Sequence, residues 1–134
     1  MEHQFRVGLG DTHDLKGAID LVETTGTVVD HKTFAKTPSQ GDVDRDIQLT
    51  AYALAQSLGG ETPPDLRLDV VVKNKTPKTA QLKTKRTEND LLWFVEMFVQ
   101  IEKAIRAGVF PPNPTGWHCS PAMCGYWDRC QQRT

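Results

Sequence analysis

The sequence predicts an α/β fold of the α+β type, in which a mixed sheet opens with a meander of three antiparallel strands and is flanked by two helices. Apolar and polar residues alternate over 5–9, the chain returns as a strand over 15–23 after a turn, and β-branched residues are frequent over 27–33, which is typical of strands. Apolar residues instead recur at helical spacing over 42–58 and 91–105, which indicates two amphipathic helices.

Length and charge limit the class of protein. With 134 residues we expect one domain over 1–134, of which 110–134 form a cysteine-bearing C-terminal segment. The net charge of −1 excludes a uniformly basic surface, so any contact with nucleic acid must be local. No apolar run approaches the roughly 20 residues that span a bilayer, and the first residues lack the pattern of a signal peptide. We therefore expect a cytoplasmic location and no membrane contact.

The first three strands are expected to be joined by two tight turns. Residues 10–14 supply the first turn, and Thr24-Thr25-Gly26 suits a three-residue loop that ends in a left-handed glycine. In the register that this loop sets, Asp20 falls opposite Asp30. Directly opposed like charges destabilise a sheet by up to about 1 kcal/mol. The pair therefore needs either solvent or a cation between its members.

The middle of the chain reads as a helix followed by two strands. The helix over 42–58 is expected to stop at Gly59-Gly60. The β-branched run Leu66–Lys73 predicts a strand, and Ala80–Thr84 a short edge strand after a turn at Thr76-Pro77.

A second helix is expected to follow these strands. Thr87 and Asp90 have the spacing of a capping box at its start, and it should end near Gly108. Trp93 and Phe94 belong to this helix and are expected to pack in the core. Prolines beyond it stiffen the connection to the cysteine segment.

Two acids and a lysine are expected to meet on one face of the sheet. Side chains alternate along a strand, so Asp30 and Lys32 share a face, and Asp20 joins them across the hairpin. Oxygen ligands placed in this way suit magnesium, and the lysine could stabilise an anionic transition state or activate water. The alternative is a solvent-facing strand that carries scattered charges.

The helix after this hairpin carries Gln48 and Tyr52 four residues apart, and therefore on one face. They could point along the sheet toward Asp30 and Lys32, where Gln48 would hold substrate or water and Tyr52 would orient a neighbour. The alternative is that Tyr52 is an aromatic residue at the edge of the core and Gln48 a surface residue.

Taken together, these motifs resemble a known family. Gly17-x-x-Asp20, then Asp30-His31-Lys32 followed by Thr33, then Gln48-x-x-x-Tyr52 resemble the RecB-type branch of the PD-(D/E)XK nuclease superfamily in order and spacing. The resemblance implies a restriction-endonuclease-like core and a magnesium or manganese ion bound by Asp20, Asp30 and the backbone carbonyl of His31. It also implies that Lys32 is the catalytic lysine and that Gln48 and Tyr52 border the active site. By the same likeness, the substrate is DNA that is single-stranded or has free ends.

The C-terminal segment carries three cysteines, Cys119, Cys124 and Cys130. An odd number in a reducing compartment argues against a disulfide framework, and the spacing would let one loop hold a metal centre. The segment resembles the tail with which RecB-like nucleases hold a [4Fe-4S] cluster, together with a fourth cysteine from an N-terminal helix. That cysteine and the histidine of the same helix have no counterpart in this sequence. The alternatives are a labile cluster on three thiolates, a zinc site with His118 as fourth ligand, and unligated thiols.

A basic stretch runs from Lys73 to Arg86, along the hairpin of the last two predicted strands. Its six cations are Lys73, Lys75, Lys78, Lys83, Lys85 and Arg86. Such a strip on an edge hairpin would follow a phosphate backbone without reading base sequence. The alternative is an edge strand protected from aggregation by its lysines. Beside a candidate phosphodiesterase site we favour DNA binding.

The sequence therefore predicts a metal-dependent DNA nuclease, and the resemblance implies a RecB-like exonuclease. The competing hypothesis is a scaffold protein that keeps the nuclease fold, binds nucleic acid and cuts weakly or not at all. A partner chain or a second copy could supply the missing N-terminal elements. Trp117, Tyr126 and Trp127 are expected to anchor the cysteine loop.

Overall fold

The structure is a computed structural model that describes residues 2–9, 13–58 and 60–131. The chain separates into two compact units, residues 1–102 and residues 103–134. The first contains all the strands, and the second contains the cysteine segment. Each is described by itself.

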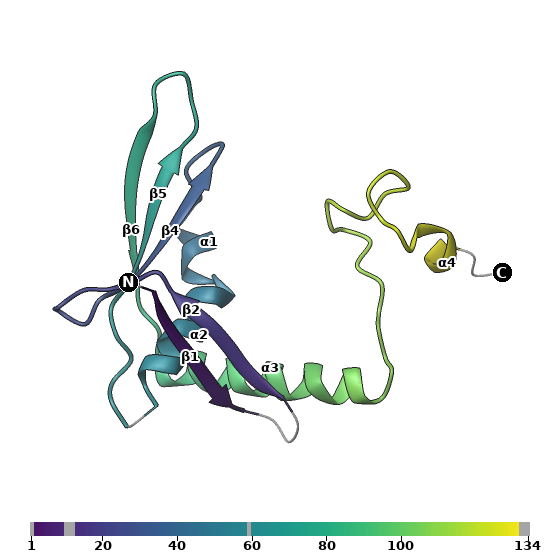
Figure 1. The fold of residues 1–134 in the computed structure, drawn as a ribbon, viewed down its shortest axis with the longest axis horizontal. Helices are drawn as coiled ribbons and strands as arrows, with labels where there is room; N and C mark the ends of the chain where they lie inside the picture. The colour runs from purple at the N-terminus through teal and green to yellow at the C-terminus, as the bar shows by residue number, and fades with distance from the viewer. Residues whose placement is uncertain (1, 10–12, 59, 132–134) are drawn as a thin grey trace. The chain divides into compact units, whose positions relative to one another are not determined.

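The first unit contains a four-stranded mixed sheet in the order β3-β4-β5-β6; Figure 1 labels β4, β5 and β6 of this sheet. Its strands are β3 (Leu21–Val22), β4 (Val28–Phe34), β5 (Leu66–Val72) and β6 (Lys78–Thr84). The pair β4-β5 is parallel, and the other two pairs are antiparallel. The mixed sheet and the strand assignments over 66–73 and 80–84 are confirmed.

The strand expected over 15–23 is divided at Asp20. Its first part, β2 (Asp14–Ile19), pairs only with β1 (His3–Gly8) in a separate two-stranded sheet, and its second part is β3. One oxygen of Asp20, Oδ2, accepts a hydrogen bond of 2.8 Å from the backbone N–H of His31. The Asp20 side chain thus binds the His31 N–H of β4. In a continuous strand, a backbone carbonyl would accept from a donor of this kind. The predicted turn falls largely on residues 10–12, which lie outside the described residues.

The helix expected over 42–58 is two helices, α1 (Gln40–Asp44) and α2 (Ile47–Gln56). Asp46 caps the second one, since its side chain accepts from the N–H of Leu49 at 2.9 Å. The guanidinium of Arg86 donates to the carbonyls of Val43 and Asp46, both at 3.1 Å, and so satisfies carbonyl groups at the break. Ser57 is the C-cap of α2; of the predicted glycine stop, Gly59 lies outside the described residues.

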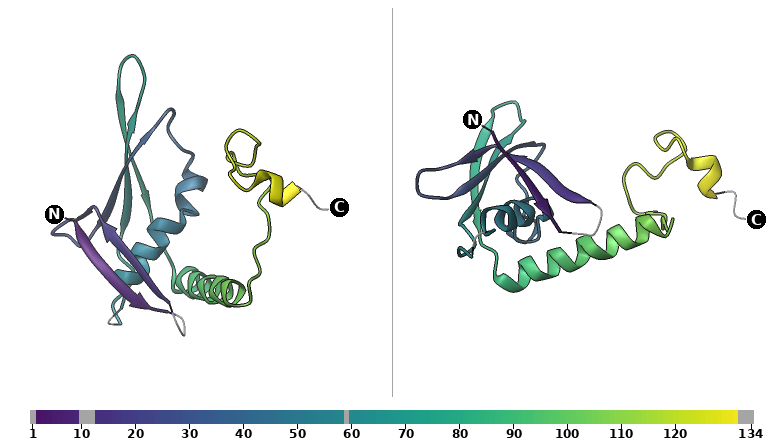
Figure 2. Two further views of the ribbon diagram at one scale, coloured as in Figure 1. Left: turned by 45° about the vertical axis from the view of Figure 1, so that its right-hand side comes forward. Right: turned by 60° about the horizontal axis from the view of Figure 1, so that its bottom comes forward.

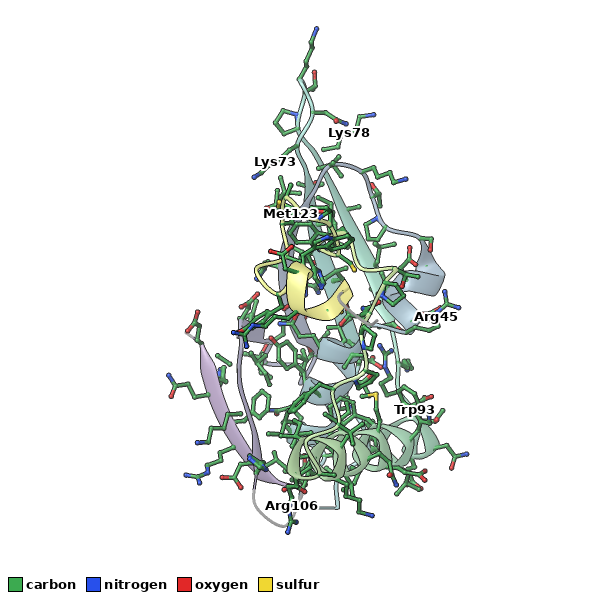
Figure 3. All side chains as sticks on the ribbon, turned by 90° about the vertical axis from the view of Figure 1, so that its right-hand side faces the viewer. Arg45, Lys73, Lys78, Trp93, Arg106 and Met123 are labelled. Atoms are coloured by element: carbon green, nitrogen blue, oxygen red, sulfur yellow. The ribbon has the colours of Figure 1, made fainter. Side chains whose placement is uncertain are left out.

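The second predicted helix is α3 (Glu88–Arg106), and its capping box is present. Asp90 accepts from the N–H of Thr87 at 2.7 Å, and Thr87 accepts from the N–H of Asp90 at 3.2 Å. Gly108, with φ of 67°, follows its end as expected. Phe94 is buried, but Trp93 is 58% exposed, so the prediction that both pack in the core is wrong for Trp93 (Figure 3). Successive residues of a helix are rotated by about 100° around its axis, so Trp93 points away from the buried face on which Phe94 lies.

The core of the first unit lies between the sheet and α2. Every second residue of β5 is buried and belongs to the core cluster that also contains residues of α2. Figure 2 shows α2 on one side of the sheet. The least exposed large side chains include Ile19, Val28, Leu49, Leu66, Leu68 and Val70. Over the ranges that the structure describes, no helix has the length and apolar character needed to cross a membrane.

The second unit begins with the last residues of α3, which are followed by turns and by α4 (Trp127–Gln131). Its three cysteines are partly buried and free. Trp117 is 82% and Tyr126 is 76% exposed, so only Trp127 among the predicted anchors is partly buried. The turns are closed instead by backbone hydrogen bonds, such as Cys119 N–H to the Gly116 carbonyl at 2.8 Å.

Candidate active site

The turn between β3 and β4 sets the register that the sequence predicts. Glu23 donates its N–H to the carbonyl of Thr27 at 2.9 Å, and Gly26 has a left-handed φ of 86°. Leu21 then pairs with Val29, and continuing this register by one residue brings Asp20 level with Asp30. The two acids therefore lie on neighbouring segments at the same height of the sheet.

Asp30 is the buried member of the pair, with only 3% of the residue exposed. Its Oδ2 atom accepts a hydrogen bond of 2.7 Å from the ammonium of Lys32, two residues further along β4. A carboxylate can be buried at tolerable cost only if a cation or donors compensate it. Lys32 supplies this compensation, and both side chains point to the face of the sheet that α2 covers.

Helix α2 brings Gln48 and Tyr52 to the same place. The side-chain oxygen of Gln48 accepts from the Lys32 ammonium, and its amide nitrogen donates to the Tyr52 hydroxyl. Because Tyr52 is only 4% exposed, it is both a core aromatic and a member of the site. A continuous chain of hydrogen bonds thus runs from Asp30 through Lys32 and Gln48 to Tyr52.

The charges of the site act on the Tyr52 phenol. Burial raises its pKa above the ordinary value, and the hydrogen bond from Gln48 opposes this. The negative charges of Asp30 and Asp20 raise the pKa further, while Lys32 lowers it. Both aspartates therefore lie within electrostatic reach of this hydroxyl.

The opposite face of the sheet carries a charged network that the sequence analysis missed. His31 faces Asp20 on one side (Nδ1 to Oδ2, 3.6 Å) and Asp69 on the other (Nε2 to Oδ2, 4.0 Å). Arg67 bonds to Asp69 and to Glu23, each at 2.7 Å, and these two bonds raise its pKa. The sequence signal for this network was the spacing of Arg67 and Asp69 within LRLDVVV. Two residues apart on a strand, both lie on the face opposite the buried residues of β5.

This network borders a hollow of the surface of about 620 Å³. The residues that line the hollow include His31, Thr33, Asp69, Val71, Thr79 and Gln81. Burial raises the pKa of Asp69, but the hydrogen bond and charge of Arg67 outweigh it, so the net pKa is lowered. Asp69 is thus held as an anion beside His31.

Five of the six cations predicted for the basic strip are exposed. Lys73, Lys75 and Lys78 are exposed around the β5-β6 turn (Figure 3), and Lys83 and Lys85 are exposed along and after β6. Lys85 pairs with Asp65 at 2.9 Å. Arg86, which the sequence analysis assigned to DNA binding, is instead 6% exposed. Its guanidinium donates hydrogen bonds within the first unit. The strip therefore contains five lysines.

The metal predictions rest on two acids and a backbone carbonyl. Within residues 2–9, 13–58 and 60–131, no group of three or more histidine, cysteine or acidic side chains is placed to hold a metal ion. The three cysteines therefore form no such group. Asp20 and Asp30 offer hard carboxylate oxygens, which are the ligands that magnesium and manganese prefer.

Comparison with known proteins identifies the family of the chain. The family model described as PD-(D/E)XK nuclease superfamily matches residues 1–131. No curated protein and no solved structure matches the chain.

Proposed function

Since this chain belongs to the PD-(D/E)XK nuclease superfamily, we propose that it is a metal-dependent DNA nuclease, a RecB-like exonuclease that hydrolyses phosphodiester bonds. One observation carries the proposal: the hydrogen bonds that join Asp30, Lys32, Gln48 and Tyr52, with Asp20 held level with Asp30 by His31. Two oxygen ligands and a cation next to each other are the groups that phosphodiester hydrolysis needs.

Asp20, Asp30 and the backbone carbonyl of His31 would hold Mg²⁺ or Mn²⁺. The donor set fits, because magnesium typically takes one or two protein carboxylates and keeps several waters. One hydrogen bond reaches the Oδ2 atom of each aspartate from His31 or Lys32, and both carboxylates keep further lone pairs that could bind the ion. When bound, such an ion supplies positive charge beside the phosphate group.

The roles of the protein's own groups follow from their contacts. Lys32 places its ammonium between Asp30 and Gln48, where it can stabilise charge that develops on the phosphate or orient the attacking water. Gln48 holds the lysine from the helix side and is itself held by Tyr52. The five exposed lysines of the strip would bind the backbone of DNA that is single-stranded or has free ends.

The test is hydrolysis of end-labelled DNA with and without Mg²⁺ or Mn²⁺. Asp30→Asn and Lys32→Ala should each lower the rate by at least about a hundredfold, because each removes a group from the centre of the site. Lys36→Ala and Glu96→Gln are matched controls, since both residues are exposed and lie outside the site. These controls should retain the full rate.

Three outcomes can be told apart. Metal-dependent cleavage that is lost in both site variants, with folding intact by circular dichroism, supports the nuclease. Salt-sensitive DNA binding without cleavage supports the scaffold hypothesis. Equal rates in the site variants and the controls would contradict the assignment of Asp30 and Lys32.

For the cysteine segment, the arrangement does not fit a metal centre held by this chain alone, since the described side chains gather no three ligands there. We assign no step to a cluster or to zinc. A cluster or zinc site on Cys119, Cys124 and Cys130, completed by a partner chain or a second copy, stays a prediction.

A further inference from the structure

The β1-β2 hairpin contains a glycine whose missing side chain leaves room for an aromatic ring. Phe5 on β1 is paired with Gly17 on β2. A Cβ atom at position 17 would lie 2.6 Å from Cζ and 2.8 Å from Cε1 of the Phe5 ring. The ring therefore lies across Gly17, and any larger residue there would displace it. This is a requirement of space, and aromatic residues commonly cover glycines in neighbouring strands in this way.

The same ring contacts the tyrosine of the candidate site. The rings of Phe5 and Tyr52 meet edge to face, with centroids 5.9 Å apart and an interplanar angle of 83°. In Figure 2 the hairpin lies beside α2, which carries Tyr52. On the same side of the hairpin, Val7 and Ile19 are buried, so Phe5 approaches Tyr52 from a hairpin that is anchored in the core.

From Tyr52 the contacts continue to the lysine. The Tyr52 hydroxyl accepts from the amide nitrogen of Gln48, which leaves the amide oxygen of Gln48 directed at the Lys32 ammonium. The Lys32 ammonium also donates to Asp30 at 2.7 Å. A tyrosine side chain has only two rotatable angles, so packing against its ring fixes where its hydroxyl lies. The position of the hydroxyl in turn decides which way the Gln48 amide is turned.

We propose that Phe5, seated over Gly17, is a positioning residue for the proposed nuclease reaction: its ring fixes Tyr52, and through Gln48 it holds the Lys32 ammonium beside Asp30. The inference rests on the proposed function for its effect on the reaction. The placement of Tyr52 and Lys32 can be measured without the reaction.

The rival explanation is that Phe5 only fills space in the core. Leu15 separates the two explanations, since it is partly buried, lies on the same hairpin opposite Val7 and packs against the same core. Leu15→Ala loosens the hairpin, yet Leu15 has no ring contact with Tyr52. It is therefore the control for a loss of stability without a loss of positioning.

The variants are made in a Tyr126→Phe background. The chain has two tyrosines, and Tyr126 is exposed in the second unit, so Tyr52 becomes the only phenol that titrates. The test variants are Phe5→Leu, Gly17→Ala and their combination. Urea unfolding establishes that each variant is folded, and Gly17→Ala serves alone if Phe5→Leu does not fold.

Two measurements follow the contacts directly. Burial raises the pKa of Tyr52, so loss or displacement of the ring should lower the ultraviolet titration midpoint toward about pH 10, the ordinary value of tyrosine. Lys32 should be acetylated faster, as measured by mass spectrometry of its peptide, because its ammonium is held less firmly. The double variant should differ little from Gly17→Ala, since both changes act through one ring.

The third measurement is turnover with DNA. Phe5→Leu and Gly17→Ala should lower kcat about tenfold and leave KM within about twofold, as expected for a misplaced catalytic group. Leu15→Ala should leave kcat, the Tyr52 midpoint and Lys32 acetylation close to those of the parent.

The outcomes separate the two proposals. A parent protein that does not cleave DNA contradicts the proposed function, and the titration and acetylation then still decide whether the ring positions Tyr52 and Lys32. A parent that cleaves DNA, with Phe5→Leu and Gly17→Ala unchanged in all three measurements, overturns the inference and leaves the function standing. Equal effects of Leu15→Ala at equal stability would overturn it too, because they would show a general loosening of the hairpin.

Discussion

The guanidinium of Arg86 is buried and donates to five oxygens. Lys83 and Lys85, which precede it in the sequence, are exposed. The acceptors are the hydroxyls of Thr50 and Thr84 and the carbonyls of Val43, Asp46 and Lys85. Burial lowers the pKa of Arg86, and the charges of Asp90, Asp46 and Asp44 oppose that change. Arginine alone among the side chains offers five donors in a planar fork, which suits this set of acceptors.

Replacing Arg86 should therefore affect folding rather than DNA binding. We expect Arg86→Met to lower the free energy of unfolding by about 3 kcal/mol, because buried carbonyls and hydroxyls lose their donor. Arg86→Lys should restore part of this loss. The measurement is urea unfolding, followed by DNA affinity at fixed salt. Lys75→Ala, at an exposed position of the strip, is the matched control and should weaken DNA binding with no loss of stability. If Arg86→Met instead weakens DNA binding and leaves the stability unchanged, Arg86 belongs to the DNA-binding surface.

Among the elements, strands and caps were predictable because their signals are local. The loop before Thr27 fixes the β3-β4 register through a left-handed glycine, and the capping box fixes the start of α3. The break between α1 and α2 was not predictable, since the donors that satisfy its carbonyls come from Arg86, 40 residues away from Asp46. The division of the second strand at Asp20 likewise depends on a bond to β4.

The cap of α3 makes a prediction about pH. Hydrogen bonds from the backbone and hydroxyl of Thr87 lower the pKa of Asp90 below its ordinary value of 3.8. A lowered pKa in the folded state means that the ionised acid stabilises the protein at pH values above the pKa of the unfolded chain. This contribution is lost as the pH falls through the pKa of the folded state. Because Asp90 is exposed, we expect only about 0.5 kcal/mol from it. Asp90→Ala should show this loss near neutral pH.

The comparison of the two unfolding curves against pH is the measurement. Stability of the parent relative to Asp90→Ala should stay constant from neutral pH down to about pH 4 and shrink below it. Glu88→Ala is the control, since Glu88 lies in the same first turn but the capping box is formed by Thr87 and Asp90. A difference that grows as the pH falls would contradict the assignment of the cap.

At the scale of the whole molecule, strand alternation, helix spacing and a family resemblance pointed to Asp20, Asp30, Lys32, Gln48 and Tyr52. Hydrogen bonds join the last four, while Asp20 bonds to the backbone N–H of His31. Their assignment to an active site stays a prediction. The parallel pairing of β4 with β5 could not be predicted from the sequence. Periodicity shows which residues of a strand face the core, but it does not show which other strand pairs with it. The network of Arg67 and Asp69 depends on that pairing, and so does its place beside His31.

The division into two units makes the last prediction. All side chains classed as buried among the described residues lie at or before Glu102, whose carboxylate bonds to His13 within the first unit. A chain that ends after Val109 keeps this contact and the hydrogen bonds that close α3, including Val109 N–H to the Ala104 carbonyl at 2.9 Å. Because hydrophobic burial dominates stability, we expect the shortened chain to unfold at the same urea concentration as the full chain.

The shortened chain should also keep the DNA cleavage proposed here, since every residue of the candidate site lies in the first unit. The control is the full chain with Cys119, Cys124 and Cys130 changed to serine, which removes the thiols and keeps the length. If the shortened chain and the serine variant both unfold earlier, the thiols stabilise the fold, and a ligand that joins them becomes the explanation. If only the shortened chain does so, the segment contributes through its other side chains, and the exposed Trp117 and Tyr126 are the first to replace.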